Sequence, residues 1–253
     1  MKAHVSLASW PGTRVAQAMR SAALGASDPL FGQLSTAEVQ LVPQSLGQLT
    51  LDEAAQLRLD WPGTRFRLHA NVRVLTQHRY ADLSNMDLQL DWFKQAARVS
   101  KCLGAAAYTA HAGRSANATL AEVLDNARRA AELFGCLVGV EGMYPSVQER
   151  WLVSSWREYQ TLFESGVPYA LDLSHLHILA SRSRVCEEQL VKEMLASPQC
   201  LEVHVSHNDG LTDCHQPCCE PAPWWFIYLR DINPAAVVFS EGLQRRPIFK
   251  GNP

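Results

Sequence analysis

Short apolar runs that end in a carboxylate or an imidazole recur along this chain. Leu137–Val140 is followed by Glu141, and Val237–Ser240 is followed by Glu241. Acidic side chains are rarely buried unless they are paired or bind a metal ion. The pattern therefore predicts buried strands whose polar ends meet at a shared site.

The order of these runs along the chain indicates the fold class. Eight segments have the character of strands: Ala3–Ala8, Ala37–Val42, Phe66–Val72, Ala105–Ala110, Cys136–Val140, Pro168–Leu173, Leu201–Val205 and Ala235–Phe239. Between most of them lie helical patterns: Arg14–Leu24, Leu51–Leu59, Leu88–Leu103, Leu120–Phe134, Val147–Phe163 and Cys186–Leu195. Strands that alternate with helices favour parallel pairing, and eight of them favour a closed (β/α)8 TIM barrel. An open doubly wound sheet is the alternative, but no Gly-rich phosphate turn follows the first strand. We expect one domain over residues 1–253.

The end of the chain leaves the barrel incomplete. Only residues 242–253 follow Glu241, and they include Pro247. The last outer helix is therefore expected to be short or missing. Either the Trp224–Phe226 region or a second copy of the chain would cover that face, so a homodimer is one expectation.

Composition limits the classes of partner. Hydrophobic residues make up 47% of the 253 residues, and the formal net charge is −2. This charge gives no general reason to bind nucleic acid, although a local strip of Arg65, Arg67, Arg73 and Arg79 keeps that option open. No apolar segment is long enough to span a membrane, and the seven cysteines show no disulfide pattern. We expect a cytoplasmic protein with a small polar substrate. Cys214, Cys218 and Cys219 are interpreted as reduced thiols, with modulation of a metal site as the alternative.

Parallel barrels carry their sites at the carboxyl ends of the strands, where several of these polar residues lie. The candidate metal ligands are His69, His111, Glu141, Asp172, His175, His204, Asp213, His215 and Glu241. Mixed carboxylate and imidazole ligands suit zinc, manganese, iron or cobalt. Four or five of them would hold one ion, and the whole set could hold more. His207, Arg73 and Trp225 are candidate substrate contacts, with packing as the alternative for Trp225.

The order and chemical types of the nine ligands resemble those of the xylose isomerase-like TIM barrel superfamily, which includes endonuclease IV and many sugar isomerases and epimerases. The resemblance to the isomerases implies one ion held by Glu141, Asp172, His204 and Glu241. It also implies that the two glutamates move a proton and that His175 contacts the substrate. The resemblance to endonuclease IV implies up to three ions held by all nine. Gly210 stands where the ketose epimerases usually have an arginine.

These resemblances leave four interpretations of function. The first is a metal-dependent isomerase or epimerase of a small sugar-like molecule, with Glu141, Glu241 and His175 as catalytic residues. The second is a multinuclear hydrolase of phosphodiesters. The stretch Leu171–Leu176 and the triplet Asp213–His215 also resemble multinuclear iron oxidases that modify peptide cysteines. An inactive barrel that serves as a binding scaffold is the fourth.

Overall fold

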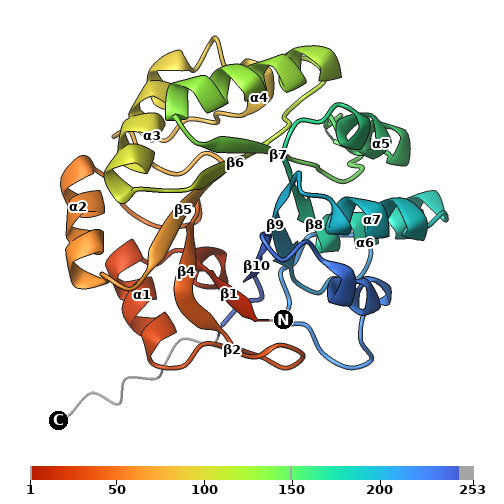
Figure 1. The fold of residues 1–253 in the computed structure, drawn as a ribbon, viewed down its shortest axis with the longest axis horizontal. Coiled ribbons are helices and arrows are strands. Elements are labelled where there is room, and N and C mark those ends of the chain that lie inside the picture. The colour runs from red at the N-terminus through yellow and green to blue at the C-terminus, as the bar shows by residue number, and fades with distance from the viewer. Residues whose placement is uncertain (1, 149, 245–253) are drawn as a thin grey trace.

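The molecule is built around a closed barrel of eight parallel strands (Figure 1). The computed structural model describes residues 2–148 and 150–244. The barrel strands are β1 (Ala3–Ser6), β4 (Ser35–Leu41), β5 (Arg65–His69), β6 (Ala107–His111), β7 (Leu137–Glu141), β8 (Tyr169–Asp172), β9 (Cys200–Val205) and β10 (Val237–Ser240). Each pairs with the next strand in this series, and β10 pairs with β1 to close the ring. The prediction of a (β/α)8 TIM barrel is confirmed.

Helices surround the barrel between successive strands. They are α1 (Val15–Ala23), α2 (Leu51–Asp60), α3 (Leu90–Leu103), α4 (Leu120–Phe134), α5 (Trp156–Glu164), α6 (Leu173–Ser183) and α7 (Glu188–Ala196). Shorter elements are the 3-10 helices η1 (Leu7–Ser9), η2 (Leu83–Asn85) and η3 (Trp224–Asp231), and a hairpin of β2 (Ser27–Asp28) and β3 (Gly32–Gln33). No helix among the described residues is long and apolar enough to cross a membrane.

Helix α4 shows how local sequence fixes these elements. Thr119 and Glu122 form a reciprocal capping box at its N-terminus, and Gly135 ends it at a φ of 67°. Its buried face consists of Val123, Leu124, Ala127, Ala130 and Phe134. Burial of each large member of this face contributes about 1.5–3 kcal/mol, so packing rather than helix propensity holds α4 against the sheet.

Two expectations about helices were wrong. The predicted helix Val147–Phe163 begins only at Trp156, because Ser155 accepts a hydrogen bond from the backbone N–H of Glu158 and so starts α5 there. Helix α6 was not predicted at all. It begins directly after β8, where a loop was expected, because Asp172 caps its first turn.

No helix follows β10 among the described residues 241–244, and the short or missing last helix stays a prediction. Residues 245–253 lie outside the described part of the chain. Trp225 and Leu229 of η3 are buried, and the ring of Phe226 meets that of Phe31 between β2 and β3 at 5.6 Å. The Trp224–Phe226 region therefore packs onto the barrel together with the hairpin. A covering second copy stays a prediction.

Candidate metal centre

The ends of neighbouring strands carry most of the candidate ligands. The final residues of β5, β6, β7 and β8 are His69, His111, Glu141 and Asp172. His204 is the penultimate residue of β9, and Glu241 directly follows β10. Because the strands are parallel, all these positions lie at one end of the barrel. Five of the six are at most 5% exposed, and His111 is the partly exposed member.

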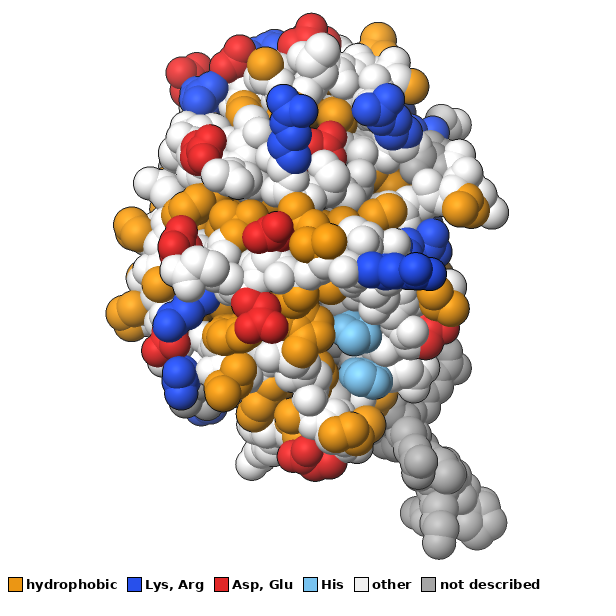
Figure 2. Space-filling model, turned by 90° about the vertical axis from the view of Figure 1, so that its right-hand side faces the viewer, with side chains coloured by type: hydrophobic (Ala, Val, Ile, Leu, Met, Phe, Trp, Pro, Cys, Tyr) orange, Lys and Arg blue, Asp and Glu red, His pale blue; other side chains and the backbone are white. Residues whose placement is uncertain are grey.

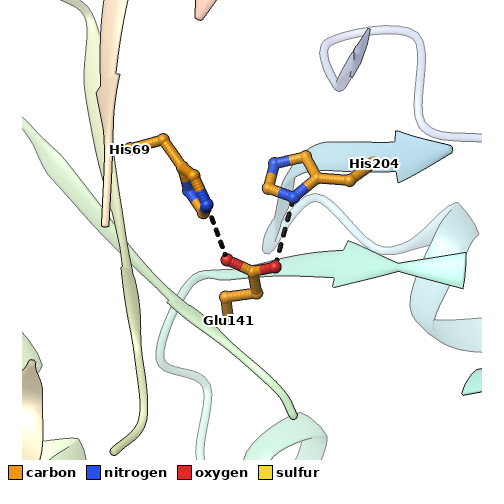
Figure 3. A group of neighbouring side chains, drawn as sticks. All are labelled: His69, Glu141 and His204. Atoms are coloured by element: carbon orange, nitrogen blue, oxygen red, sulfur yellow. Dashed lines mark hydrogen bonds and ion pairs between the residues drawn. The ribbon is translucent and has the colours of Figure 1, made fainter. Parts of the chain in front are cut away.

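Glu141 lies at the centre of this group (Figure 3). Its Oε2 is 3.2 Å from Nε2 of His69 and 3.5 Å from Nε2 of His111. Its Oε1 is 3.3 Å from Nδ1 of His204 and 3.9 Å from Nδ1 of His175. One carboxylate therefore faces four imidazoles that come from four different elements.

A second set of contacts joins the remaining candidates. Oδ2 of Asp213 is 3.3 Å from Nε2 of His175 and 3.2 Å from Nε2 of His215. Nδ1 of His215 is 3.4 Å from Oε2 of Glu241, and Oδ2 of Asp172 is 3.4 Å from Nε2 of His175. The structure thus brings all nine predicted ligands into one continuous cluster. Their role as metal ligands stays a prediction.

The loop after β9 brings Asp213 and His215 back to this cluster. His207 and Gln216 exchange two backbone hydrogen bonds of 2.7 and 2.8 Å, which closes the segment between them into a loop. Ser174 donates its hydroxyl to Oδ1 of Asp213 at 3.3 Å. His215 adopts a left-handed φ of 47°, which is uncommon for a residue other than glycine and is often found at functional sites.

The cluster has the donor chemistry of a transition-metal site. Three groups of three residues could each hold an ion, because within each group the ligand atoms lie within 4.8 Å of one another. The groups are His69–Glu141–His204, Glu141–Asp172–His175 and Asp172–His204–Glu241. Oε2 of Glu141 and Nδ1 of His215 are buried without a hydrogen-bond partner among the described residues, although Nε2 of His69 lies 3.2 Å from the first and Oε2 of Glu241 lies 3.4 Å from the second. Buried polar atoms normally have partners, so these two atoms are what bound cations would satisfy. The residues present therefore fit divalent ions.

Burial and neighbouring carboxylates compete over the charge of the imidazoles. Burial lowers the pKa of His175, but Asp172 and Asp213 outweigh it and raise the pKa to about 10. His215 behaves similarly: burial lowers its pKa, and Asp213 and Glu241 raise it to about 9. Burial dominates at His69, and lowers its pKa to about 3. Without an ion, some imidazoles thus hold protons at the positions where a metal would bind.

The two strand-end glutamates differ in their affinity for protons. Burial alone would raise the pKa of Glu141, but His69 and His204 together hold it well below the usual range. Burial raises the pKa of Glu241 to about 7, despite the opposing effect of His204 and His215. At neutral pH one glutamate is therefore ionised while the other holds a proton for part of the time.

The three predicted substrate contacts are not gathered in the same way. Trp225 is 1% exposed and belongs to the hydrophobic core, so packing is the role that its position supports. Arg73 donates its Nε to the backbone oxygen of Pro43 at 3.2 Å. His207 is half-buried at the base of the Asp213 loop, with its ring 6.3 Å from that of His177.

Three of the four arginines considered as a basic strip pair with acidic side chains. Arg67 is 8% exposed and pairs with Glu202 inside the barrel, Arg65 pairs with Glu38, and Arg79 pairs with Asp91. On the flank viewed in Figure 2, acidic and basic side chains are interspersed among hydrophobic ones. This face offers no continuous basic surface of the kind that nucleic acids need.

Tyr144 was missed by the sequence analysis. Its ring is tilted against that of His175, with 4.8 Å between the centroids. Burial raises the pKa of its hydroxyl, and so do Asp213 and Asp172. Its sequence signal was its place three residues after the strand-end Glu141, in the loop beside the barrel mouth.

The fold has many counterparts among solved structures. A D-tagatose 3-epimerase-like protein aligns with a TM-score of 0.67 and 16% identity, over 96% of this chain and 92% of its own. An AP endonuclease, family 2, from Brucella melitensis aligns with 0.64 and 15%, over 97% and 94%. The IOLI protein with a bound zinc atom aligns with 0.61 and 12%, over 96% and 90%. No family model and no curated protein matches the sequence. The chain therefore shares the fold of these solved structures, and its own barrel is a closed ring of eight parallel strands.

Proposed function

We propose that this protein is a divalent-metal-dependent enzyme that isomerises or epimerises a small sugar-like substrate. The observation that carries the proposal is the pair of buried glutamates beside His204. An oxygen of Glu141 lies 3.3 Å from Nδ1 of His204, and an oxygen of Glu241 lies 3.8 Å from it. The resemblance in fold to solved sugar epimerases supports the same reaction class.

The two glutamates would divide the proton transfer between them. Glu141 is ionised at neutral pH because its pKa is lowered, so its carboxylate is free to take a proton from the carbon beside a carbonyl group. Glu241, with a pKa of about 7, is suited to return one. Glu141, Asp172, His204 and Glu241 would hold a zinc, manganese, iron or cobalt ion, which when bound polarises the substrate oxygens. His175 and Tyr144, which adjoin this group, would contact the substrate.

Solvent isotope exchange tests this proposal directly. The protein, loaded with each metal in turn, is incubated in D2O with a panel of ketoses and aldoses, and NMR follows deuterium incorporation beside the carbonyl. We expect exchange with wild-type protein and nearly complete loss in Glu141→Gln and Glu241→Gln. Glu38→Gln is the matched control, because Glu38 is a buried acid that pairs with Arg65 away from the cluster. Full exchange in both site variants would show that the proton-transfer role is wrong.

A multinuclear hydrolase of phosphodiesters is the second candidate. It is favoured by one observation: His69, His111, Asp213 and His215 join the cluster although a single ion does not need them. Elemental analysis of gently purified protein separates the candidates. About one ion per chain favours the isomerase, and two or three favour the hydrolase, to be checked by cleavage of DNA that contains abasic sites.

The same measurement covers the remaining interpretations. Several iron ions with visible colour and oxygen-dependent activity would indicate an oxidase that modifies peptide cysteines. A protein that takes up none of these metals would indicate an inactive binding scaffold.

A further inference from the structure

A second layer of polar side chains lies inside the barrel beneath the candidate ligands. Glu202 is two residues before His204 on β9, and Arg67 is two residues before His69 on β5. Side chains two apart on a strand point to the same face, so Glu202 and Arg67 also point into the barrel. Glu202 is completely buried. An acid in the middle of a buried strand calls for a specific reason.

The contacts of Glu202 supply that reason. Its Oε2 lies 3.2 Å from Nε2 of His204 and accepts a hydrogen bond of 3.0 Å from the hydroxyl of Thr109. The same hydroxyl oxygen lies 3.0 Å from Nδ1 of His69. A hydroxyl can donate one hydrogen bond and accept another. His69, Thr109, Glu202 and His204 therefore form one chain of hydrogen bonds across the barrel.

This chain determines which ring nitrogen of each imidazole is free. Nε2 of His69 and Nδ1 of His204 are the atoms that face Glu141 (Figure 3). Each needs a lone pair to bind a cation, so each ring must carry its proton on the opposite nitrogen. Nε2 of His204 contacts Glu202 directly. Nδ1 of His69 is connected to Glu202 through the hydroxyl of Thr109.

We propose that Glu202 is the positioning residue for two metal ligands at once, fixing the tautomer and ring orientation of both His204 and His69. This inference rests on the proposed metal site and adds to it a residue outside the nine ligands. Carboxylates that accept the second N–H of a metal-binding histidine orient the ring and raise its basicity. Here one carboxylate serves two rings on β5 and β9.

Arg67 forms an ion pair with the buried carboxylate of Glu202. Its Nη1 lies 3.3 Å from Oε1 of Glu202, and its Nε lies 3.6 Å from Oε2 of Glu38. An unpaired buried charge is strongly destabilising, and this pair removes that cost. Glu38 thus shares Arg67 with Glu202 but, among the described residues, forms no hydrogen bond or ion pair with the ring of His69 or His204, which makes it a matched control.

Gln40 is the remaining neighbour. Its amide nitrogen lies 2.8 Å from Nε2 of His204 and donates to Oε2 of Glu202 at 3.2 Å, and its amide oxygen accepts from the hydroxyl of Ser6 at 2.7 Å. The amide nitrogen is a donor and cannot accept a proton from the ring. A proton on Nε2 of His204 is therefore directed to Oε2 of Glu202.

Metal affinity and the spectrum of bound cobalt test the proposal. Zinc and cobalt dissociation constants are measured by chelator competition, and the visible spectrum of the Co²⁺-loaded protein reports ligand geometry. Glu202→Gln keeps the side-chain size but replaces one accepting oxygen with a donor. We expect it to weaken binding about 10–100-fold and to shift the cobalt spectrum. Glu38→Gln should leave both at wild-type values.

Thr109 provides a second pair of variants in case Glu202→Gln does not fold. Thr109→Val removes the link to His69 at nearly constant volume and should weaken binding, whereas Thr109→Ser keeps the hydroxyl and should restore it. Wild-type affinity and an unchanged cobalt spectrum in both Thr109→Val and a folded Glu202→Gln would overturn the inference while leaving the metal site in place. A wild-type protein that binds no transition metal would overturn the site and the inference together.

Discussion

Asp172 contacts the backbone of His175 with one carboxylate oxygen and the ring of His175 with the other. Oδ1 accepts the backbone N–H groups of Ser174 and His175, at 2.7 and 3.1 Å, and so caps α6. Oδ2 lies 3.4 Å from Nε2 of the His175 ring. The residue that starts the helix thus also aims an oxygen at the ring which the helix carries.

Substitutions of Asp172 can therefore separate its role as a helix cap from its proposed role as a metal ligand. Asparagine caps helices about as well as aspartate, so Asp172→Asn should keep the cap of α6 and, in the metal-free protein, lose only the pairing with the protonated ring of His175. Its neutral amide is a poor metal ligand, so metal affinity should fall at least tenfold. Asp172→Ala should lose the cap as well, which costs about 1 kcal/mol. Calorimetry of the metal-free proteins and chelator competition measure the two effects. Equal metal affinity in Asp172→Asn and wild type would remove Asp172 from the ligand set.

The raised pKa values of His175 and His215 predict a pH-dependent stability. In the metal-free fold these groups hold protons up to about pH 10 and 9, whereas in the unfolded chain they release them near 6.5. Their stabilising contribution is thus complete below about pH 6.5 and is lost as the pH rises through 9 and 10. The melting temperature of the metal-free protein should fall between pH 7 and 9.

A bound metal supplies the control for this pH effect. Coordination displaces the protons from the imidazoles, so loaded protein should show a smaller fall over the same interval, and metal uptake at pH 7 should release protons. Calorimetric titration in buffers of different ionisation enthalpy counts them. An equal fall in melting temperature between pH 7 and 9 with and without metal would contradict the assignment of His175 and His215 as metal ligands.

Gly142 is required at its position for steric reasons. A Cβ there would come within 2.4 Å of the buried ring of Tyr159. Gly142→Ala should therefore destabilise the protein by about 1–3 kcal/mol. The backbone oxygen of Gly142 also lies 3.0 Å from Nδ1 of His175, so a shift of this loop should weaken metal binding too. Gly63→Ala is the control, because nothing lies within 4 Å of its added Cβ. Urea unfolding compares the two, and equal stabilities would refute the steric argument.

Trp225 distinguishes packing from substrate contact. Because the side chain of Trp225 is fully buried, Trp225→Ala should lower the free energy of unfolding by about 3–5 kcal/mol. Trp225→Phe should recover most of that loss. Once an active substrate is known, KM of the folded Trp225→Phe should equal that of wild type. A large rise in KM at unchanged stability would restore the substrate-binding role predicted from sequence.

The strands could be predicted because burial on both faces leaves continuous apolar runs, as in Val138–Val140. Helix starts were harder to predict because they depend on single caps. In Val147–Phe163, apolar residues at helical spacing extend beyond the true helix, and only the cap at Ser155 shows where α5 begins. At α6 the same Asp172 ends a strand and starts a helix, so a pattern of period two passes into one of 3.6 without a break.

The candidate site was predictable to the extent that strand ends determine position. His69, Glu141 and Asp172 come together because parallel strands end at one rim. Arg73 lies on a loop whose path the sequence does not reveal. Trp225 lies in the short helix η3, and its burial supports packing, one of the two roles expected for it. Glu202 was overlooked although its signal was present: it and Arg67 are opposite charges in the middle of apolar strands.

The distribution of the nine side chains around the ring has a mechanical consequence. They come from β5 through β9, from α6 and from the segments that follow β9 and β10, and no two adjacent elements carry the set alone. A cation coordinated there would act as a cross-link among segments that are far apart in the sequence. Removing it should therefore increase hydrogen exchange of amide groups all around the rim of the barrel, from His69 to Glu241, and not in one loop only.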